Sequence, residues 1–395
     1  MRFFHLSDLH IGRLLYQYSL LEDQKSIMEQ IVERVREYKP DALIIAGDIF
    51  DKPVPSGEAV MAFDHFLTEL AGLQDGPELM ITAGNHDSAE RLDYGASLLE
   101  KLRIHIAALP PERGEYLKCI RLYDDFGPVD FYLMPFIKPP YIRRLFEEGE
   151  EPKTYDGAVR ALLAREQPEK GVRKVIVAHQ FFTAAGAATI TCDSEVLQVG
   201  GLDQVDISAF KDFDYGALGH IHGPQNVGCQ RFRYCGSPLK YSLSEAGHHK
   251  SLTMVELGAA GIEPVITELP LTPLRDVRSL RGKLDELLSA AQYDMNRDDY
   301  VSITLTDEQE QMDARERLLD IFPHLLEVQV DNTRTRQQLA ESFDAEMVRG
   351  PEEIFAEFFE GVQGRSLTEA EEKIIQSAIN RSKVQEAGQE GDNQE

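Results

Sequence analysis

The sequence of 395 residues predicts an α/β protein, a sandwich of mainly parallel and mixed β-sheets flanked by helices. Two observations lead to this prediction. Short apolar runs alternate with helical patterns through the first half of the chain, and later strand-like runs follow with fewer helices between them. We expect the sandwich to end near residue 270, because Pro264, Pro270 and Pro273 punctuate the stretch around that point.

The elements of the sandwich follow from their local patterns in chain order. Residues 2–6 have the pattern of a strand, and apolar residues recur every four positions in a helix expected over 22–38. Residues 42–46 are apolar throughout, as expected for a strand covered on both faces. The sequence then predicts helices near 57–71 and 89–102, and strands at 78–83, 130–134, 174–178, 215–218, 232–235 and 251–257.

A small accessory domain is expected after the sandwich. Residues 274–292 have a charged helical pattern. Strand-like alternation at 300–305 and 326–330 flanks a second helical pattern at 309–321. This unit is too small to be the main fold, and the polar stretch 333–338 that follows is typical of a linker.

The C-terminal tail predicts two short helices with apolar stripes. The first begins at Pro351 and carries Phe355 and Phe358, and the second begins with the capping-box pattern of Ser366 and Glu369. Such stripes need a surface to bury them, so we expect docking on a partner protein, with packing against this chain as the alternative. The expected domains are therefore a main domain over 1–270, an accessory domain over 274–332, docking helices over 339–383 and a disordered tail over 384–395.

Composition narrows the class of protein. The formal net charge of −27 argues against DNA binding through a basic surface of this chain alone, unless bound cations or a partner supply positive charge. The four cysteines show no C-x-x-C spacing, so we expect reduced thiols rather than a zinc ribbon or a redox pair. The N-terminus lacks a signal-peptide pattern, and no apolar run approaches the ~20 residues that span a bilayer. A cytoplasmic location without membrane contact is therefore expected.

Polar residues gather at five places where a predicted strand ends. Strand ends in open α/β sheets collect in one crevice, where ligands bind. Carboxylate, imidazole and amide groups together suit two divalent metal ions, and two ions about 3.5–4 Å apart can neutralise a phosphodiester and activate water. The sequence therefore predicts a two-metal phosphoesterase built from Asp8, His10, Asp48, Asn85, His86, Asp87, His179, His220 and His222.

The spacing of these residues suggests how the ions are shared. Asp48 follows an apolar strand and is the best candidate for a carboxylate that bridges the ions. Asp8 and His10 lie two residues apart, so at an extended strand end they point to the same side and can bind one ion. His220 and His222 repeat this spacing, although each of them could face a different ion.

Asn85 and His179 complete the expected ligands, because they add a neutral oxygen and another imidazole. His86 stands beside them and is assigned a different role. A histidine close to the ions but not bound to them can protonate the leaving oxygen, and a carboxylate can orient it and raise its pKa. We therefore expect His86 to be the general acid and Asp87 to orient it.

In this order the motifs resemble the signature of the calcineurin-like metallophosphoesterases. The resemblance implies a β-sandwich flanked by helices and a dinuclear metal site. It rests on Asp8-x-His10, Gly47-Asp48, Gly84-Asn85-His86-Asp87, His179 and Gly219-His220-x-His222.

Longer runs around these motifs are similar to the SbcD-type subunits of bacterial DNA repair nucleases, the counterparts of the Mre-type nucleases. These runs are residues 47–51, 84–91, 178–181, 213–225 and 234–242. The resemblance implies His86 as the catalytic histidine and a metal ion, usually manganese, in each of two sites. It assigns Asp8, His10, Asp48 and His222 to one ion, and Asp48, Asn85, His179 and His220 to the other.

The same resemblance implies a partner and a substrate. SbcD-type subunits work with an SbcC-type coiled-coil ATPase, cleave double-stranded DNA ends exonucleolytically, and cleave hairpin or single-stranded DNA endonucleolytically. It further implies a homodimer within a heterotetramer that acts in DNA repair, recombination and replication. The tail helices over 339–383 would then dock on the coiled-coil base of the ATPase.

Two other interpretations were weighed. One is a phosphodiesterase or phosphatase for small substrates on the same core, but such an enzyme has little need for residues 275–380. The other is a scaffold protein whose metal site has decayed, but a competent residue fills every ligand position. The expected function is therefore a metal-dependent DNA nuclease subunit.

Overall fold

The computed structural model describes residues 1–184, 189–195, 203–309 and 311–336, with the short pieces 355–356, 359–360, 365–368, 371–373 and 375–376. The chain divides into two compact units. The first contains Met1–Leu280, Ala290–Ile303 and Arg315–Glu327, and the second contains Arg281–Ser289, Thr304–Ala314 and the residues from Val328 on. The predicted helices over 339–383 and the tail over 384–395 lie almost wholly outside the described residues.

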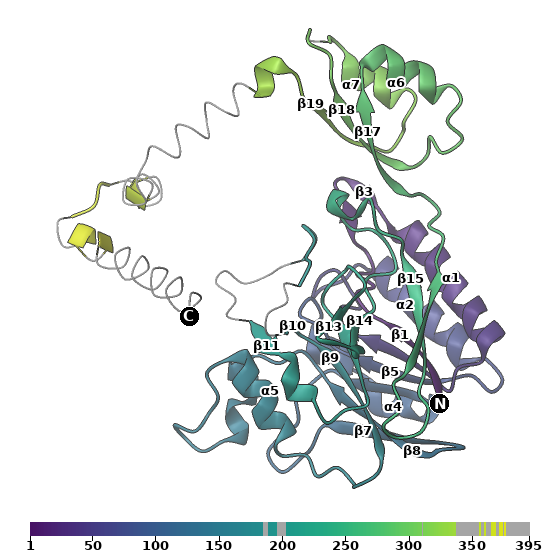
Figure 1. Cartoon of the computed structure of the whole chain (residues 1–395), viewed down its shortest axis with the longest axis vertical. Helices are drawn as coiled ribbons and strands as arrows, with labels where there is room; N and C mark the ends of the chain where they lie inside the picture. Colours follow the sequence, from purple (N-terminus) through teal and green to yellow (C-terminus); the bar gives the residue numbers. More distant parts are fainter. Residues whose placement is uncertain are drawn as a thin grey trace, which may run out of the picture. The chain divides into compact units, whose positions relative to one another are not determined.

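One six-stranded sheet has the order β16-β15-β1-β4-β5-β6. Its strands β1, β5 and β15 are labelled in Figure 1. Its four strands β1, β4, β5 and β6 run parallel, whereas β15 and β16 run antiparallel to their neighbours. Helices α1 and α2 pack their apolar side chains against one face. The bounds are β1 Arg2–Leu6, β4 Ala42–Ala46, β5 Glu78–Thr82, β6 Ile104–Ala107, β15 Ser251–Glu256, β16 Val265–Pro270, α1 Leu21–Tyr38 and α2 Gly57–Ala71.

A second six-stranded sheet has the order β13-β14-β12-β9-β8-β7. Strands β8, β9, β12 and β14 are parallel, and antiparallel edge strands close both sides. Helix α5 packs against the outer face of this sheet. The bounds are β7 Lys118–Asp124, β8 Gly127–Met134, β9 Arg173–His179, β12 Tyr215–Gly219, β13 Gln225–Val227, β14 Cys229–Tyr234 and α5 Tyr155–Leu163.

The two sheets face each other across a common apolar core. The Phe3 ring of β1 lies edge-on to Phe131 of β8 and to Tyr215 of β12, with ring centroids 5.5 Å apart in both pairs. Successive residues of β1 alternate between this core and the core under the helices, so Phe3 faces one and Phe4 the other. Burial on both faces explains the continuous apolar runs of the parallel strands. The predicted α/β sandwich flanked by helices is confirmed.

The single helix expected over residues 89–102 is wrong. The segment forms α3 (Ala89–Asp93), α4 (Ala96–Leu99) and a 3-10 turn η1 (Glu100–Leu102). Tyr94 has φ −58° and ψ 119°, which is not helical, and Gly95 has φ +78°, in the left-handed region that glycine adopts without steric cost. These two residues end the first helix and turn the chain before the second begins.

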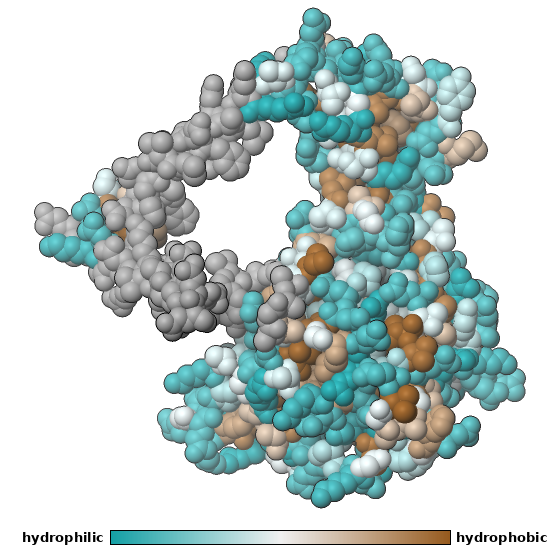
Figure 2. Space-filling model, in the orientation of Figure 1, coloured by the Kyte–Doolittle hydropathy of each residue, from teal (hydrophilic) through white to brown (hydrophobic). Residues whose placement is uncertain are grey.

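Short elements connect the sandwich strands. They are β2 Leu14–Leu15, β3 Tyr18–Ser19, β10 Phe181–Thr183, β11 Gln204–Asp206, and the 3-10 turns η2 Pro139–Leu145, η3 Ile207–Phe210 and η4 Leu243–Glu245. The face of the molecule seen in Figure 2 is largely hydrophilic with scattered hydrophobic spots, as expected when 28% of the residues are charged. The helices of the described residues are all too short or too polar to span a membrane.

The C-terminal region forms a three-stranded sheet in the order β17-β18-β19 with helices α6 and α7. The helix predicted over 274–292 is wrong in its first half, which forms a strand before the helix begins at Leu284. Gly282 interrupts the helical pattern, and the Leu284 N–H bonds to the Asp307 carboxylate at 2.9 Å. The domain boundary near 270 stays a prediction. The bounds are β17 Val277–Gly282, α6 Leu284–Ala291, β18 Tyr300–Leu305, α7 Ala314–Leu319 and β19 Leu325–Val330.

Candidate metal centre

Each predicted site residue lies at or just after the C-terminal end of a parallel strand. Asp8 and His10 follow β1, Asp48 follows β4, the Asn85–His86–Asp87 run follows β5, His179 ends β9, and His220 and His222 follow β12. Several of these residues have a left-handed backbone, which is uncommon for residues other than glycine and is found at functional sites. Their φ angles are +54° at Asp8, +42° at His10, +51° at Asp48 and +104° at His220.

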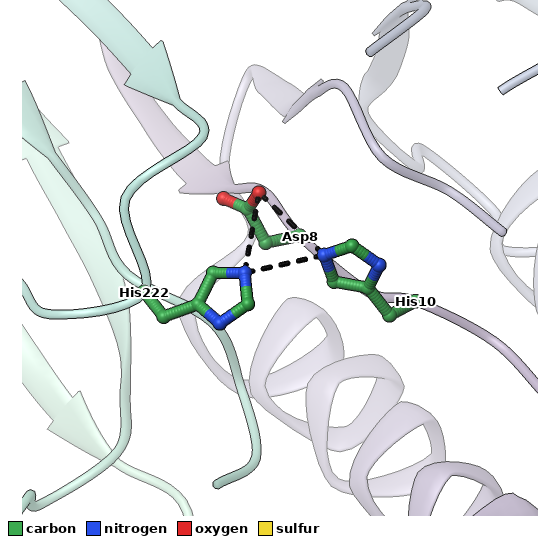
Figure 3. A group of neighbouring side chains, drawn as sticks. All are labelled: Asp8, His10 and His222. Atoms are coloured by element: carbon green, nitrogen blue, oxygen red, sulfur yellow. Dashed lines mark hydrogen bonds and ion pairs between the residues drawn. The ribbon is translucent and has the colours of Figure 1, made fainter. Parts of the chain in front are cut away.

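Asp8, His10 and His222 form one cluster (Figure 3). The Nε2 atoms of the two imidazoles are 3.2 Å apart, and each is 4.0 Å from Oδ1 of Asp8. All three side chains are buried. Two imidazole nitrogens and a carboxylate oxygen that converge on one point, out of contact with water, are a suitable donor set for a divalent cation.

Asn85, His179 and His220 form a second cluster beside the first. The Asn85 amide oxygen lies 3.0 Å from His179 Nε2 and 3.0 Å from His220 Nδ1. The other ring nitrogen of His179, Nδ1, lies 2.8 Å from the Ala46 carbonyl oxygen and therefore donates to it. This bond leaves Nε2 of His179 facing the amide oxygen.

Asp48 faces both clusters. Its Oδ2 atom lies 3.5 Å from His10 Nε2 in the first cluster and 3.4 Å from His179 Nε2 in the second. Its other oxygen accepts a hydrogen bond of 2.9 Å from the His86 backbone N–H. The residues present therefore fit two neighbouring divalent ions, with one carboxylate between the two donor sets.

Burial keeps two of the ligand imidazoles neutral, whereas His179 is charged in the metal-free chain. Burial lowers the pKa of His10 well below its usual value and lowers that of His220 to about 3. Both imidazoles are therefore neutral near pH 7, the form that binds a metal. Burial opposes charge on Asp48 and His179 as well, but their mutual attraction outweighs it. The pKa of Asp48 is accordingly held well below its usual value, and that of His179 is raised to about 9.

His86 lies at the edge of the first cluster, with its ring edge-on to His10 at a centroid distance of 4.8 Å. Its Nδ1 atom lies 2.9 Å from the backbone oxygen of Asp51. A carbonyl oxygen only accepts, so Nδ1 carries the proton and Nε2 is the nitrogen available for chemistry.

The expectation that Asp87 orients the His86 ring is corrected by the structure. The Asp87 carboxylate accepts hydrogen bonds from the backbone N–H groups of Ile49, Phe50 and Gly84 at 2.8–3.1 Å. It therefore ties the loop after β4 to the loop after β5, and the Asp51 carbonyl orients the ring instead. Burial and the charge of Asp48 raise the pKa of Asp87 to about 6. Adjacent residues in a turn point in different directions, so adjacency alone misassigned this partner.

Sequence reasoning missed the residues behind the first cluster. Ser194, Glu195 and Glu245 contact His222, and Gln24 binds the His10 carbonyl oxygen through its Nε2 at 2.7 Å. These residues come from a helix and from separate loops, and no local motif marks them. Only their position in the folded chain brings them to the site.

Two family models match the chain. Residues 1–224 match the model described as calcineurin-like phosphoesterase, and residues 273–363 match the SbcD C-terminal model, described as the Type 5 capsule protein repressor C-terminal domain. Together these matches extend over both the sandwich and the C-terminal region. The first covers more than half of the 395 residues.

Three solved structures are similar at low identity, and no function is transferred from them. One is titled "GAP50 the anchor in the inner membrane complex of Plasmodium" (11% identity, TM-score 0.38, 69% of this chain and 89% of that chain). A hypothetical protein from Thermus thermophilus has 14% identity and a TM-score of 0.35 over 68% of this chain and 100% of that chain. The NAD nucleotidase of Haemophilus influenzae has 12% identity and a TM-score of 0.31 over 88% of this chain and 60% of that chain.

Proposed function

The chain belongs to the calcineurin-like phosphoesterases, and on that premise we propose that it is the nuclease subunit of an SbcD-type DNA repair complex. As a member of this family it is a metal-dependent phosphoesterase. The match of its C-terminal region to the SbcD C-terminal family favours DNA over a small phosphodiester as the substrate. The two adjacent donor clusters that meet at Asp48 are the observation that carries the proposal.

The proposed ligands divide between two divalent ions, with manganese as the proposed metal. Asp8, His10 and His222 would hold one ion, Asn85, His179 and His220 would hold the other, and Asp48 would contact both. When bound, the two ions supply positive charge for the phosphate and a water molecule of lowered pKa.

His86 is the proposed general acid. Its Nδ1 proton is donated to the Asp51 carbonyl oxygen, so the ring is held in one orientation. As a general acid the ring is an imidazolium, and its second proton, on Nε2, is the one transferred to the leaving oxygen. Its backbone N–H binds Oδ1 of Asp48, so the ring and the proposed bridging carboxylate are fixed relative to each other. A proton donor in this place acts beside the ions without being a ligand.

Partners of the chain form part of the proposal. A net charge of −27 is a poor basis for binding a polyanion, so we propose that an SbcC-type coiled-coil ATPase supplies DNA-binding surface and docks on residues 339–383. The proposed assembly contains two copies of each subunit and acts on DNA ends and hairpins in repair, recombination and replication. The four cysteines are free, which agrees with a cytoplasmic location for the complex.

The test is cleavage of end-labelled linear double-stranded DNA by the full chain with Mn²⁺, beside a chromogenic phosphodiester. His86→Ala should lower hydrolysis of both substrates by about 10²–10⁴-fold, the usual contribution of a general acid, while metal content is kept. His65→Ala, at an exposed histidine of α2, serves as the matched control and should change neither.

Three results would count against the proposal or refine it. Full activity in His86→Ala would reject the role of general acid. Loss of both ions in that variant would show that His86 is a ligand. If the wild type cleaves only the small phosphodiester, the ATPase partner is added, and DNA that stays intact then rejects the nuclease assignment.

A further inference from the structure

Behind the ring of His222 lies a chain of hydrogen bonds made by residues outside every motif of the sequence. Nδ1 of His222 lies 2.7 Å from the Ser194 hydroxyl oxygen. The same hydroxyl lies 2.6 Å from Oε1 of Glu245. Ser194 and Glu245 are both buried, and they are separated from His222 by 28 and 23 residues of sequence, respectively.

The direction of these bonds follows from the donors available. A carboxylate only accepts, so the single proton of the Ser194 hydroxyl is donated to Glu245. The oxygen of Ser194 is then left to accept from His222, which places a proton on Nδ1. In the neutral ring this leaves Nε2 unprotonated, and Nε2 is the atom that faces His10 and Asp8 in the first cluster. This is the tautomer that a metal ligand requires.

Glu245 is itself rigidly held. Lys250 donates to its Oε2 at 2.6 Å, and the backbone N–H of Tyr241 donates to its Oε1 at 3.1 Å. The Ser242 hydroxyl donates to the same oxygen at 3.0 Å. Glu245 is 0% exposed, and its pKa is held below the usual value. Burial raises this pKa, but the contacts of the carboxylate with His222 and with the Lys250 ammonium outweigh it. A fully buried carboxylate with this many donors cannot rotate away from Ser194 without leaving charge unpaired.

The backbone around His222 is tied to the same residues. Lys250 donates to the His222 carbonyl oxygen at 3.0 Å, and the His222 N–H donates to Oε1 of Glu195 at 2.6 Å. Next to Ser194, the Asp193 N–H donates to the Ser244 hydroxyl at 3.0 Å. The serine is therefore fixed from its own segment as well as from Glu245. Ring and backbone of His222 are both positioned by side chains from two other loops.

We propose that Ser194 and Glu245 are positioning residues of His222, and that they set the affinity with which Asp8, His10 and His222 hold one divalent ion. The proposal rests on the proposed two-metal function and goes beyond it by naming residues that act through a ligand. Outer groups of this kind typically change metal affinity by about 10–100-fold. The affinity for the second ion is expected not to depend on Ser194, because among the described residues its donor cluster has no contact with Ser194.

The test is a titration of the chelator-treated full chain with Mn²⁺ by calorimetry, with electron paramagnetic resonance to separate paired ions from single ones. Ser194→Ala should weaken one of two ions by about 10–100-fold and leave the other unchanged. Ser251→Ala is the matched control, since the hydroxyl of this buried serine has no hydrogen-bond partner among the residues that the structure describes. It should bind both ions as the wild type does.

Glu245→Gln should weaken the binding of the same ion. The double variant with Ser194→Ala should lose little more affinity than the single variant with the larger loss, because both residues act through one chain of bonds. If Glu245→Gln does not fold, Glu245→Gln with Lys250→Met removes the unpaired lysine charge and repeats the test. Additive losses, or equal weakening of both ions, would overturn the proposal.

Failure of this inference is distinguishable from failure of the proposed function. Two ions bound normally by Ser194→Ala would overturn the inference while leaving the nuclease assignment intact. A wild type that binds two ions, with one weakened in Ser194→Ala, supports the inference even where DNA is not cleaved. A wild type that binds no Mn²⁺ overturns both.

Discussion

The two halves of the metal centre are built in different ways. One half is formed by Asp8, His10 and His222. There Nδ1 of His222 bonds to the Ser194 side chain, which in turn bonds to Glu245. In the half of Asn85, His179 and His220, the second ring nitrogen of His179 is held by the backbone of β4 at Ala46. One half depends on side chains from distant loops, and the other depends on the close approach of strands.

Glycines permit that close approach. A Cβ atom on Gly219 would lie 1.9 Å from the Ala46 carbonyl oxygen, and one on Gly47 would lie 2.3 Å from His179 Nδ1. Gly47 also has φ +86°, which strains any other residue. These glycines belong to the motifs that the sequence displays, whereas Ser194 and Glu245 do not. The motifs therefore display the ligands of both halves and the glycines that support one of them, but they do not include the side chains that support the other.

The largest expected effect comes from Asp48→Asn, which acts on both halves at once. The carboxylate lies within 3.5 Å of a histidine in each cluster, and the amide lacks its charge. Activity on the chromogenic phosphodiester should fall by about a thousandfold or more, because the ions supply several kcal/mol and each 1.36 kcal/mol is tenfold. Metal analysis should find neither ion bound tightly. Retention of both ions would show that Asp48 is not shared.

Gly219→Ala should damage the half formed by Asn85, His179 and His220 most, although the added Cβ would also lie 2.9 Å from Cβ of Ser7, the residue before Asp8 of the other half. The added Cβ collides with the Ala46 oxygen and would lie 2.8 Å from His179 Nδ1, so β12 and β4 must separate. The free energy of unfolding should fall by about 1–3 kcal/mol, and one ion should be lost. Gly247→Ala, where a Cβ meets nothing within 4 Å, is the control for denaturant unfolding and metal analysis. Loss of the ion held by His222 instead would contradict the division into halves.

The smallest expected effect is a pH dependence of the metal-free chain. The pKa of His179 is raised to about 9 in the folded protein, above its ordinary value of 6.5. Its stabilising contribution is therefore fully present below pH 6.5 and is lost as the pH rises through 9. One titrating proton cannot change the free energy of unfolding by more than about 1.4 kcal/mol per pH unit.

Denaturant unfolding between pH 6.5 and 9, in chelator and in Mn²⁺, measures this slope. A bound ion requires the neutral imidazole, so Mn²⁺ should flatten the dependence. His179→Gln should flatten it as well without metal. A slope that survives in His179→Gln belongs to another group.

The accuracy of the sequence prediction differs between elements for a physical reason. Strands β1 and β4 match their predicted bounds, because burial demands an apolar run. The short parallel strand β6 is absent from the sequence prediction, and β8 begins three residues before its predicted start. The helix near 89–102 was predicted as one piece, because the turn at Tyr94 and Gly95 leaves the apolar spacing intact. The sequence of strand β17 also fits a helical pattern, because a charged segment with spaced leucines is compatible with either structure until it pairs in a sheet.

The sequence by itself determined which donors reach the centre. Parallel strands put their C-terminal ends at one edge of a sheet, so the residues that follow β1, β4 and β5 lie near one another in one sheet, and those that follow β9 and β12 lie near one another in the other. The packing of the two sheets then brings the two edges together. Only the tertiary structure decided which groups hydrogen-bond to those donors and orient them. The partner of His86 is a backbone oxygen rather than Asp87, and His222 is held by Ser194 and Glu245. Side-chain direction in a loop depends on the local φ and ψ angles and on neighbours distant in sequence. A short sequence motif determines neither the angles nor the neighbours.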